Sequence, residues 1–501
     1  MKKTFAALGF GSLLVGLGAV SGACSSSDTP GSSSGSSADG GSDAPAAAAF
    51  DLAVACADSI DAVYGDPGAL PADKGAIIKC AKDKDIPKAD LEAAAKAEEG
   101  YEGKPFTSGA KTFRILYRTE RGNGKAGYSS AIVYVPDTPR TKADLPVVVA
   151  SHGSRGQAAK CAPSKQDPAA SAVEGDYHHQ VYPLVGAGYA VIAPDLAGYA
   201  NYGAADNPPS SYADADDVGK STLDGARALK KLFKAGLSNK VVITGHSQGG
   251  GTALAALGIS DAYGFDMPIA GVAVYAPLWL PGRTNQAVLA DPATYPFSSG
   301  AVPKVVTWFL YTQGELRDGP GKGAEIFKAD KRDGIKKFVD ETCWAADYPL
   351  LNSLGKDLGD VVDPAFAKSV GVLANCPASD ALCTKWQARF DAVRPHISGN
   401  AGKVPILTIG GDKDPSITPA YQACVNDRLR NDKANYKYCY VPGANHNNVV
   451  SKRAAHVNDW IGNLTLGEPA PTGCELGEAD LKDGTGQQQK CDALINAFNE
   501  Y

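Results

Sequence analysis

The chain has no long cluster of lysine or arginine and no Cys-x-x-Cys pair. Its formal net charge is −6 over 501 residues, and an acidic chain without a basic patch is a poor candidate for binding nucleic acid. Without closely spaced cysteines, zinc-site or thioredoxin chemistry has no support. Hydrophobic residues make up 44% of the chain and charged residues 21%, which is the balance of a folded globular protein with an ample core.

Only one stretch could enter a membrane, and it lies at the extreme N-terminus. Lys2 and Lys3 precede a glycine-interrupted apolar run over residues 5–20, and small residues follow at 21–23. These three parts predict a secretory signal peptide over residues 1–23. A spanning helix is disfavoured because the run is short and polar chain follows it directly.

Cys24 follows the expected cleavage site, and the arrangement resembles a bacterial lipoprotein signal, in which this cysteine is lipidated. Three residues earlier the pattern prefers Leu, whereas this chain has Ser21, so secretion after Ala23 is the alternative. Residues 24–49 have the Ser/Gly/Ala composition of a flexible tether, which favours lipidation. We therefore expect export, either to the bacterial cell envelope with a lipid anchor in the membrane or as a secreted protein.

The cysteine count agrees with export. Leaving out Cys24, ten of the eleven cysteines remain, an even number that suits five disulfides in an oxidising compartment. The connectivity cannot be read from sequence. Closeness along the chain suggests Cys376 with Cys383 and Cys474 with Cys491.

Changes in composition divide the rest of the chain. Residues 50–105 are interpreted as a helical extension. Over 106–280 and 403–461, short apolar runs alternate with helical patterns, which predicts an α/β fold with a mostly parallel sheet and helices on both faces. Residues 281–402 are too many for a structureless loop and are interpreted as an inserted lid or cap. Residues 462–501 form a tail that contains two cysteines.

The expected strands are short. Residues 112–119 and 129–135, joined by a Gly-Asn-Gly turn, predict a β-hairpin. Continuous apolar runs predict six buried strands, at 146–150, 189–194, 241–244, 270–275, 404–409 and 436–441.

Residues 245–249 read Gly-His-Ser-Gln-Gly, which matches the GxSxG pattern of a nucleophile elbow. The pattern alone is weak, and a second match at 31–35 lies in the tether. At 245–249, however, a predicted strand precedes the motif and a helical pattern follows it. A sharp strand-to-helix turn lifts a hydroxyl above the sheet, so we predict Ser247 as a nucleophile.

A serine hydroxyl needs a base to take its proton, and in this architecture the base is a histidine that follows Ser247 in the chain. Three histidines qualify by position. His396 lies in the insertion and His456 in a helical pattern, whereas His446 lies in a loop directly after the last expected strand. We therefore expect His446 to be the base.

The base needs a carboxylate to orient it, and the acid should follow the strand at 404–409. Asp412 and Asp414 compete for this position. The spacing Gly-x-x-Asp with proline next favours Asp414, and Asp412 is interpreted as a turn residue.

An oxyanion hole requires two backbone N–H donors. The first expected donor is Gln248, which follows the nucleophile. The second should come from the His-Gly turn at 151–156, where we choose Ser154, with Gly153 as the nearest alternative. His152 precedes Ser247 in the chain, so it is assigned a structural role.

Together these residues resemble the α/β-hydrolase serine esterases. More narrowly, residues 110–461 resemble the secretory lipase family, which includes fungal lipase A-type enzymes. The hairpin, the segment 184–199, the Ser-Gln-Gly-Gly elbow and the insertion before the acid carry that resemblance. It implies hydrolysis of a small-molecule or lipid ester, with the insertion as a lid over an acyl-binding cleft. No metal and no organic cofactor are implied.

Two other functions stay open from sequence. A serine exopeptidase has the same architecture, although its elbow more often carries an aromatic residue where Gln248 stands. A surface-tethered binding protein on a retired hydrolase scaffold is disfavoured, because serine, acid and histidine are all present in order. The aromatic side chains of the insertion line a substrate channel or form the insertion's own core: Trp308, Phe309, Phe327, Phe338, Trp344 and Trp386. The oligomeric state cannot be read from sequence.

Overall fold

The computed structural model describes residues 50–482 and 489–491, except for 168–176, 201–203, 205–206, 280, 282, 299–300 and 345–347. The expected signal peptide, the tether and Cys24 lie outside these residues. Among the helices that are described, none is long and apolar enough to cross a membrane.

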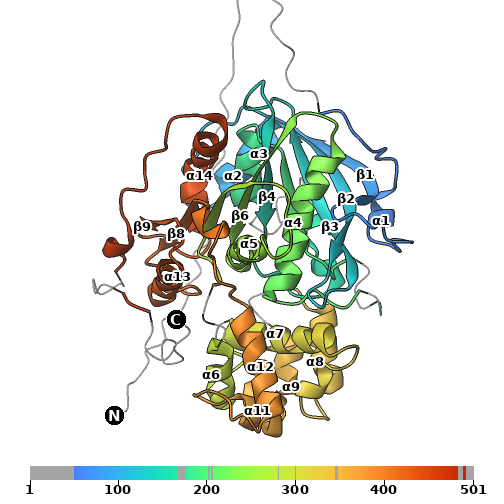
Figure 1. Ribbon diagram of the computed structural model, residues 1–501, viewed down its shortest axis with the longest axis vertical. Helices are drawn as coiled ribbons and strands as arrows, with labels where there is room; N and C mark the ends of the chain where they lie inside the picture. Colours follow the sequence, from blue (N-terminus) through green and yellow to red (C-terminus); the bar gives the residue numbers. More distant parts are fainter. Residues whose placement is uncertain are drawn as a thin grey trace, which may run out of the picture. The chain divides into compact units, whose positions relative to one another are not determined.

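A nine-stranded sheet is the centre of the described chain (Figure 1). Its strand order is β1-β2-β3-β5-β4-β6-β7-β8-β9. The pairs β1–β2, β2–β3 and β3–β5 are antiparallel, and every other pair, starting with β5–β4, is parallel. The fold class predicted from sequence is confirmed, and so is the β2–β3 hairpin. The strands are β1 (Ile77–Ile86), β2 (Ala110–Glu120), β3 (Ala126–Pro136), β4 (Leu145–Ser151), β5 (Val191–Pro194), β6 (Leu237–His246), β7 (Ile269–Tyr275), β8 (Ile406–Gly411) and β9 (Tyr436–Val441).

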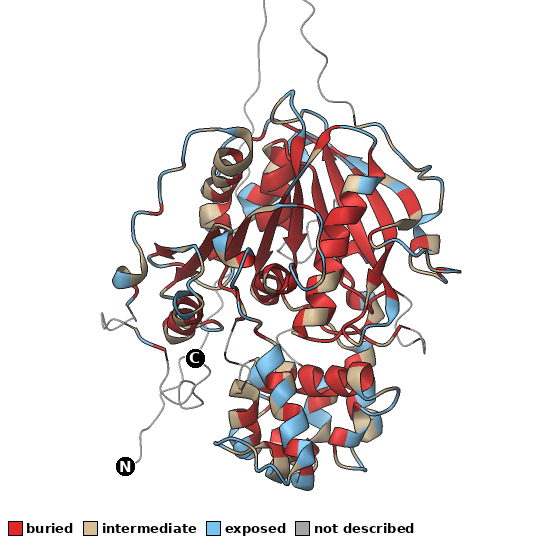
Figure 2. Cartoon of the chain, viewed as in Figure 1, coloured by how far each residue is buried: buried red, intermediate tan, exposed pale blue. Residues whose placement is uncertain are grey.

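Helices cover both faces of this sheet, which explains why its central strands are apolar without alternation. On β6, Val241 and Ile243 pack into the core on one face, while Val242 between them packs into the core on the other. Three helices pack their side chains into the first core: α4 (Ala215–Leu232), α5 (Gln248–Ile259) and α13 (Pro419–Asn431). The second receives α2 (Lys88–Ala97), α3 (Tyr182–Gly186) and α14 (Asn448–Leu466). Buried residues fill both layers (Figure 2).

The N-terminal extension differs from its prediction. Only α1 (Ile60–Val63) and α2 are helical, and the residues between them include β1, which pairs antiparallel with β2 at the edge of the sheet. The charged residues at 82–85 hide this strand from a pattern of apolar residues. Lys82, Lys84 and Asp85 are exposed, as an edge strand allows, whereas Asp83 forms a buried ion pair with Arg114 of β2.

The chain between β7 and β8 is helical, and its apolar side chains form a core of their own (Figures 1 and 2). Trp308, Phe327, Phe338 and Trp386 lie in this core, as one of the two sequence interpretations held. The helices are α6 (Thr284–Ala290), α7 (Val302–Arg317), α8 (Arg332–Glu341), α9 (Pro349–Leu354), α10 (Leu358–Val361), α11 (Pro364–Val370) and α12 (Ala381–Ala392).

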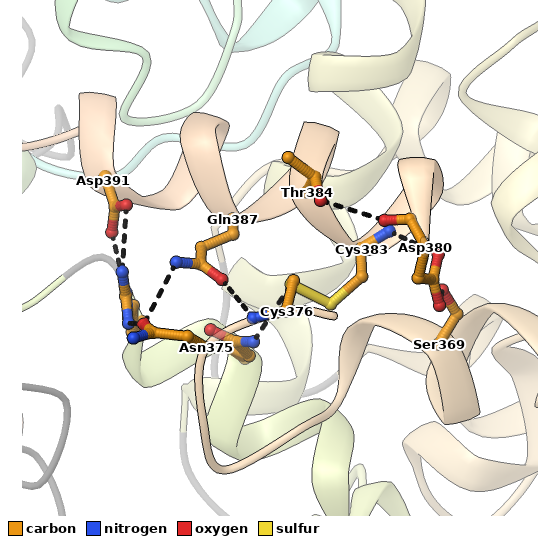
Figure 3. The surroundings of a disulfide bond; sticks show 10 residues. Ser369, Asn375, Cys376, Asp380, Cys383, Thr384, Gln387 and Asp391 are labelled. Atoms are coloured by element: carbon orange, nitrogen blue, oxygen red, sulfur yellow. Dashed lines mark hydrogen bonds and ion pairs between the residues drawn. A yellow bond between two sulfur atoms is a disulfide. The ribbon is translucent and has the colours of Figure 1, made fainter. Parts of the chain in front are cut away.

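Ten cysteines form five disulfides. The predicted Cys376–Cys383 bond is confirmed, and the side-chain oxygen of Gln387 accepts the Cys376 N–H beside it at 2.9 Å (Figure 3). The predicted Cys474–Cys491 bond is wrong. The tail runs back along β9, where Tyr440 N–H donates to the Leu476 carbonyl at 2.9 Å, and this places Cys474 beside Cys439 on that strand. The remaining pairs are Cys56–Cys80, Cys161–Cys343, Cys424–Cys491 and Cys439–Cys474.

Candidate active site

Ser247 lies at the turn between β6 and α5. Its φ is +55° and its ψ is −118°, a region that a residue with a side chain rarely adopts. Hydrogen bonds on both sides hold this conformation: Ser247 N–H donates to the Tyr275 carbonyl at 2.9 Å, and Leu278 N–H donates to the Ser247 carbonyl at 2.8 Å. This is the local geometry of a nucleophile elbow.

The two glycines of the motif are required for space. A Cβ on Gly245 would lie 2.1 Å from the carbonyl oxygen of Gly249. A Cβ on Gly249 would lie 2.1 Å from the carbonyl oxygen of Ser151 at the end of β4. Because backbone cannot yield to such overlaps, the GxSxG spacing is fixed by the close packing of α5 against two strands.

His446 and Asp414 contact each other directly. Nδ1 of His446 lies 2.8 Å from Oδ2 of Asp414, whose side chain is fully buried. The other oxygen of Asp414 accepts the N–H groups of Ser416 and Ile417, each at 2.8 Å. Since a carboxylate only accepts, Nδ1 of His446 carries the proton and Nε2 is left to act as an acceptor.

Asp412 has a different environment from Asp414. Its Oδ1 accepts the Gly443 N–H at 2.5 Å, and the next residue, Lys413, donates its N–H to the Ala444 carbonyl at 3.0 Å. Of the two aspartates that competed in the sequence, Asp414 is therefore the one that contacts His446. Asp412 secures the turn that leads to it.

A reciprocal pair of asparagines surrounds His446. The side-chain oxygen of Asn448 accepts the Asn445 N–H at 2.7 Å, and the side-chain oxygen of Asn445 accepts the Asn448 N–H at 2.9 Å, as in a capping box at the start of α14. Glu99, at the end of α2, accepts the Asn448 amide at 2.9 Å and the Asn445 amide at 3.4 Å. The N-terminal extension therefore reaches the loop that carries His446.

His246, the residue before the elbow serine, also contacts His446. Its Nε2 lies 2.8 Å from the His446 carbonyl oxygen, and the two ring centroids are 4.7 Å apart. The ring of His179 meets His246 edge-on at 5.4 Å. Sequence reasoning did not assign a role to His246, His179 or Glu99. For His246 the sequence does offer a signal, because this residue lies inside the Gly-x-Ser-x-Gly motif, directly before Ser247.

The two residues predicted for the oxyanion hole come from different segments, the start of α5 and the loop after β4. Gln248 is the first residue of α5, where backbone N–H groups have no partner within the helix and the helix dipole is positive. Ser154 lines the same cavity as Ser247, and its Oγ lies 2.7 Å from the Tyr212 hydroxyl. The ring nitrogens of His152 contact two backbone carbonyl oxygens, of Gly153 at 2.6 Å and of Asp195 at 3.3 Å, which agrees with a structural role.

A cavity of about 380 Å³ opens at this site and is lined by both Ser247 and His446. One face of α7 forms an apolar wall, with Val302, Val305, Val306 and Phe309 at helical spacings of three and four. Trp344, which follows α8, lines it as well, so of the six aromatic residues named from the sequence, Phe309 and Trp344 line the cavity. The arrangement can hold an apolar group next to a serine hydroxyl.

Comparisons with known proteins agree with the fold that carries this site. Residues 147–457 match the alpha/beta hydrolase family. Among solved structures, the rice cell wall degrading esterase LipA from Xanthomonas oryzae is similar with a TM-score of 0.56 and 15% identity, covering 79% of this chain and 97% of that one. Candida antarctica lipase A in its closed state gives a TM-score of 0.56 and 17% identity, covering 85% and 92%. No curated protein sequence matches the chain.

Proposed function

This chain belongs to the alpha/beta hydrolase family, and from that premise we propose that it is an exported serine hydrolase that cleaves carboxylic esters. In this proposal Ser247 is the nucleophile, His446 the general base and Asp414 the residue that orients it. Gln248 and Ser154 donate backbone N–H groups to the oxyanion. The hydrogen-bonded pair of His446 and Asp414, with His446 in the cavity that Ser247 lines, argues against a retired binding protein.

One observation carries the proposal: the imidazole of His446, bound at 2.8 Å to a buried carboxylate, lines the same cavity as the strained elbow serine. A buried carboxylate favours the protonated imidazole that forms when the histidine takes a proton. The capping asparagines and Asp414 restrict the histidine to one position. Pre-positioned groups of this kind lower the entropy that the reaction must lose.

The reaction begins when the Ser247 hydroxyl attacks the ester carbonyl carbon and its proton passes to Nε2 of His446. The carbonyl oxygen takes the negative charge and is stabilised by the two N–H donors. As the tetrahedral intermediate collapses, the C–O bond to the alcohol breaks and His446 returns the proton to the leaving oxygen. Water, deprotonated by His446, then attacks the acyl-enzyme. As this second intermediate collapses, the bond from the acyl carbon to Ser247 Oγ breaks, His446 returns the proton to Oγ, and the carboxylic acid leaves.

The apolar wall of α7 supports an acyl group as the part of the substrate that enters the cavity. Four of its side chains are apolar and face the serine side of the insertion. Apolar surface buried on binding contributes about 25 cal/mol per Å², so an alkyl chain gains affinity there. The esterase and the lipase among the similar structures are consistent with an ester substrate.

Export is supported by five disulfides, which persist in oxidising compartments. Lipidation of Cys24 remains part of the proposal and has its own test. Cells producing the full chain should yield a protein that partitions into detergent and carries acyl groups at Cys24. Cys24→Ala should lose both properties, and an unmodified wild-type N-terminus would contradict the anchor.

A fluorophosphonate probe tests the catalytic serine. Wild-type protein should be labelled covalently, with Ser247 Oγ displacing fluoride, and Ser247→Ala should not. p-Nitrophenyl esters and aminoacyl anilides then separate the reaction classes. Ester turnover with inert anilides is expected, and the reverse result would make the protein an exopeptidase.

A further inference from the structure

The insertion between β7 and β8 is joined to the loop of the predicted oxyanion hole by a covalent bond. Cys161 lies in the loop after β4, which also contains Ser154, and Cys343 lies just after α8 in the insertion. Their disulfide spans 182 residues of sequence. No movement of this end of the insertion away from the loop is possible while the bond is intact.

Backbone contacts reinforce the bond on the side of Ser154. Gly156 pairs with Cys343 as an isolated β-bridge, and Trp344 N–H donates to the Arg155 carbonyl at 2.8 Å. A Cβ on Gly156 would lie 2.4 Å from the Thr342 carbonyl oxygen, and its φ is +87°. Only glycine permits this approach. The insertion thus contacts the two residues that directly follow Ser154.

The insertion has a second attachment to the sheet layer, through α7. Tyr212 N–H donates to Thr312 Oγ1 at 3.0 Å, and the Gln313 amide donates to Asp214 Oδ2 at 3.0 Å. The guanidinium of Arg317 binds both oxygens of Asp214, at 2.7 and 2.9 Å. Asp214 is buried and caps α4, so α7 is attached to a helix of the sheet layer.

We propose that the insertion is a fixed cap, held by the Cys161–Cys343 disulfide and by α7, and that the substrates of this cleft are single dissolved esters rather than a lipid–water interface. The inference rests on the proposed function. A lid that opens at an interface must move away from the serine, and here such a movement would displace the oxyanion loop with it. Trp344 is 37% exposed, and its backbone N–H is bonded to the Arg155 carbonyl, so its side chain stays at the cavity as part of the lining.

The test compares two disulfide variants of the mature protein. Cys161→Ser/Cys343→Ser frees the cap, while Cys376→Ser/Cys383→Ser removes a disulfide within the insertion and serves as the matched control. Rates are measured on dissolved p-nitrophenyl butyrate and on tributyrin below and above its solubility limit. Hydrogen exchange of residues 302–317 and 151–161 is measured in parallel.

Wild-type protein and the control should show one saturation curve for tributyrin, without a jump when the emulsion forms. The freed-cap variant should exchange faster in both segments and lose about tenfold in kcat on the dissolved ester, because its oxyanion donor is no longer held in place. A wild-type jump at the solubility limit, or exchange that is the same in the freed-cap variant and wild type, would overturn the fixed cap.

Failure of the proposed function gives a different pattern. It would appear as no ester turnover and no fluorophosphonate labelling in any variant, whereas exchange would still report whether the cap is fixed. If the freed-cap variant does not fold, the wild-type tributyrin curve and its exchange rates decide alone. Rapid exchange across 302–317 in wild-type protein would contradict the proposal even then.

Discussion

His246 donates a hydrogen bond from Nε2 to the backbone carbonyl oxygen of His446 at 2.8 Å, across 200 residues of sequence. A carbonyl can only accept, so the proton is on Nε2 of His246. The residue before the proposed nucleophile therefore holds the backbone of the proposed base. This bond connects the elbow at the end of β6 to the loop between β9 and α14, and the proposed reaction requires the two to stay in register.

Replacing His246 should misplace His446 without removing any reacting group. His246→Phe keeps a buried ring but loses the N–H donor, and we expect kcat for a p-nitrophenyl ester to fall by about 10- to 100-fold. KM should change little, because the apolar wall of α7 is untouched. Steady-state kinetics on the purified variant measure both constants.

His246→Gln is the control, since its amide N–H can reach the same carbonyl and should restore part of the loss. A merely structural role for His246 would lower thermal stability in both variants and leave kcat per folded molecule unchanged. That result would remove His246 from the positioning of the base.

The two aspartates after β8 make a matched pair. Asp414→Asn should lower kcat by about 10⁴, because an amide at this position favours the wrong tautomer of His446 and cannot stabilise its protonated form. Asp412→Asn should change kcat by less than about threefold, since an amide oxygen can still accept the Gly443 N–H. Equal losses in the two variants would contradict the assignment of Asp414.

Sequence reasoning could predict that Ser247, Asp414 and His446 belong to one candidate site, because each follows a strand with a recognisable pattern. Ser247 follows an apolar run and stands between glycines that backbone packing requires. Asp414 follows β8 and His446 follows β9, the last two strands of the parallel part of the sheet. The carboxyl ends of parallel strands lie at one edge of the sheet, so chain order and strand position place them close together.

Other features depend on contacts that no local pattern encodes. β1 carries charged residues at 82–85, so the sequence predicts helix where the structure has a strand paired with β2. Cys474 and Cys491 lie 17 positions apart in the sequence, yet each bonds to a cysteine of the α/β core instead. Glu99 reaches the His446 loop only because α2 packs on the face that carries α14.

Glu99 lies outside the residues that match the family, yet it accepts hydrogen bonds from both asparagines beside His446. Glu99→Ala should loosen this loop and lower kcat by about three- to tenfold with KM unchanged. Glu99→Gln retains one acceptor oxygen and should be intermediate. Glu102→Gln is the control, because Glu102 pairs with Arg453 on α14 instead. Full activity in Glu99→Ala would show that the capping asparagines hold the loop without it.

Phe309 ends the apolar wall of α7, and its ring is also buried in the core of the insertion, 5.8 Å from the ring of Phe390. Phe309→Leu shortens this side chain and should move the preferred acyl chain of p-nitrophenyl esters to longer lengths. The variant should lose roughly 1–3 kcal/mol of stability, as expected when a buried side chain is truncated. A chain-length series of kcat/KM at fixed temperature measures the shift.

The matched control is Phe338→Leu, because Phe338 lies in the same core, stacked at 5.6 Å on Trp308, and does not line the cavity. It should be destabilised to a similar extent while keeping the wild-type chain-length profile. A shift in both variants would mean that loosening the insertion core is enough to change specificity. A shift in neither would place the acyl chain against another wall of the cavity, with the side chains of α6 the next to test.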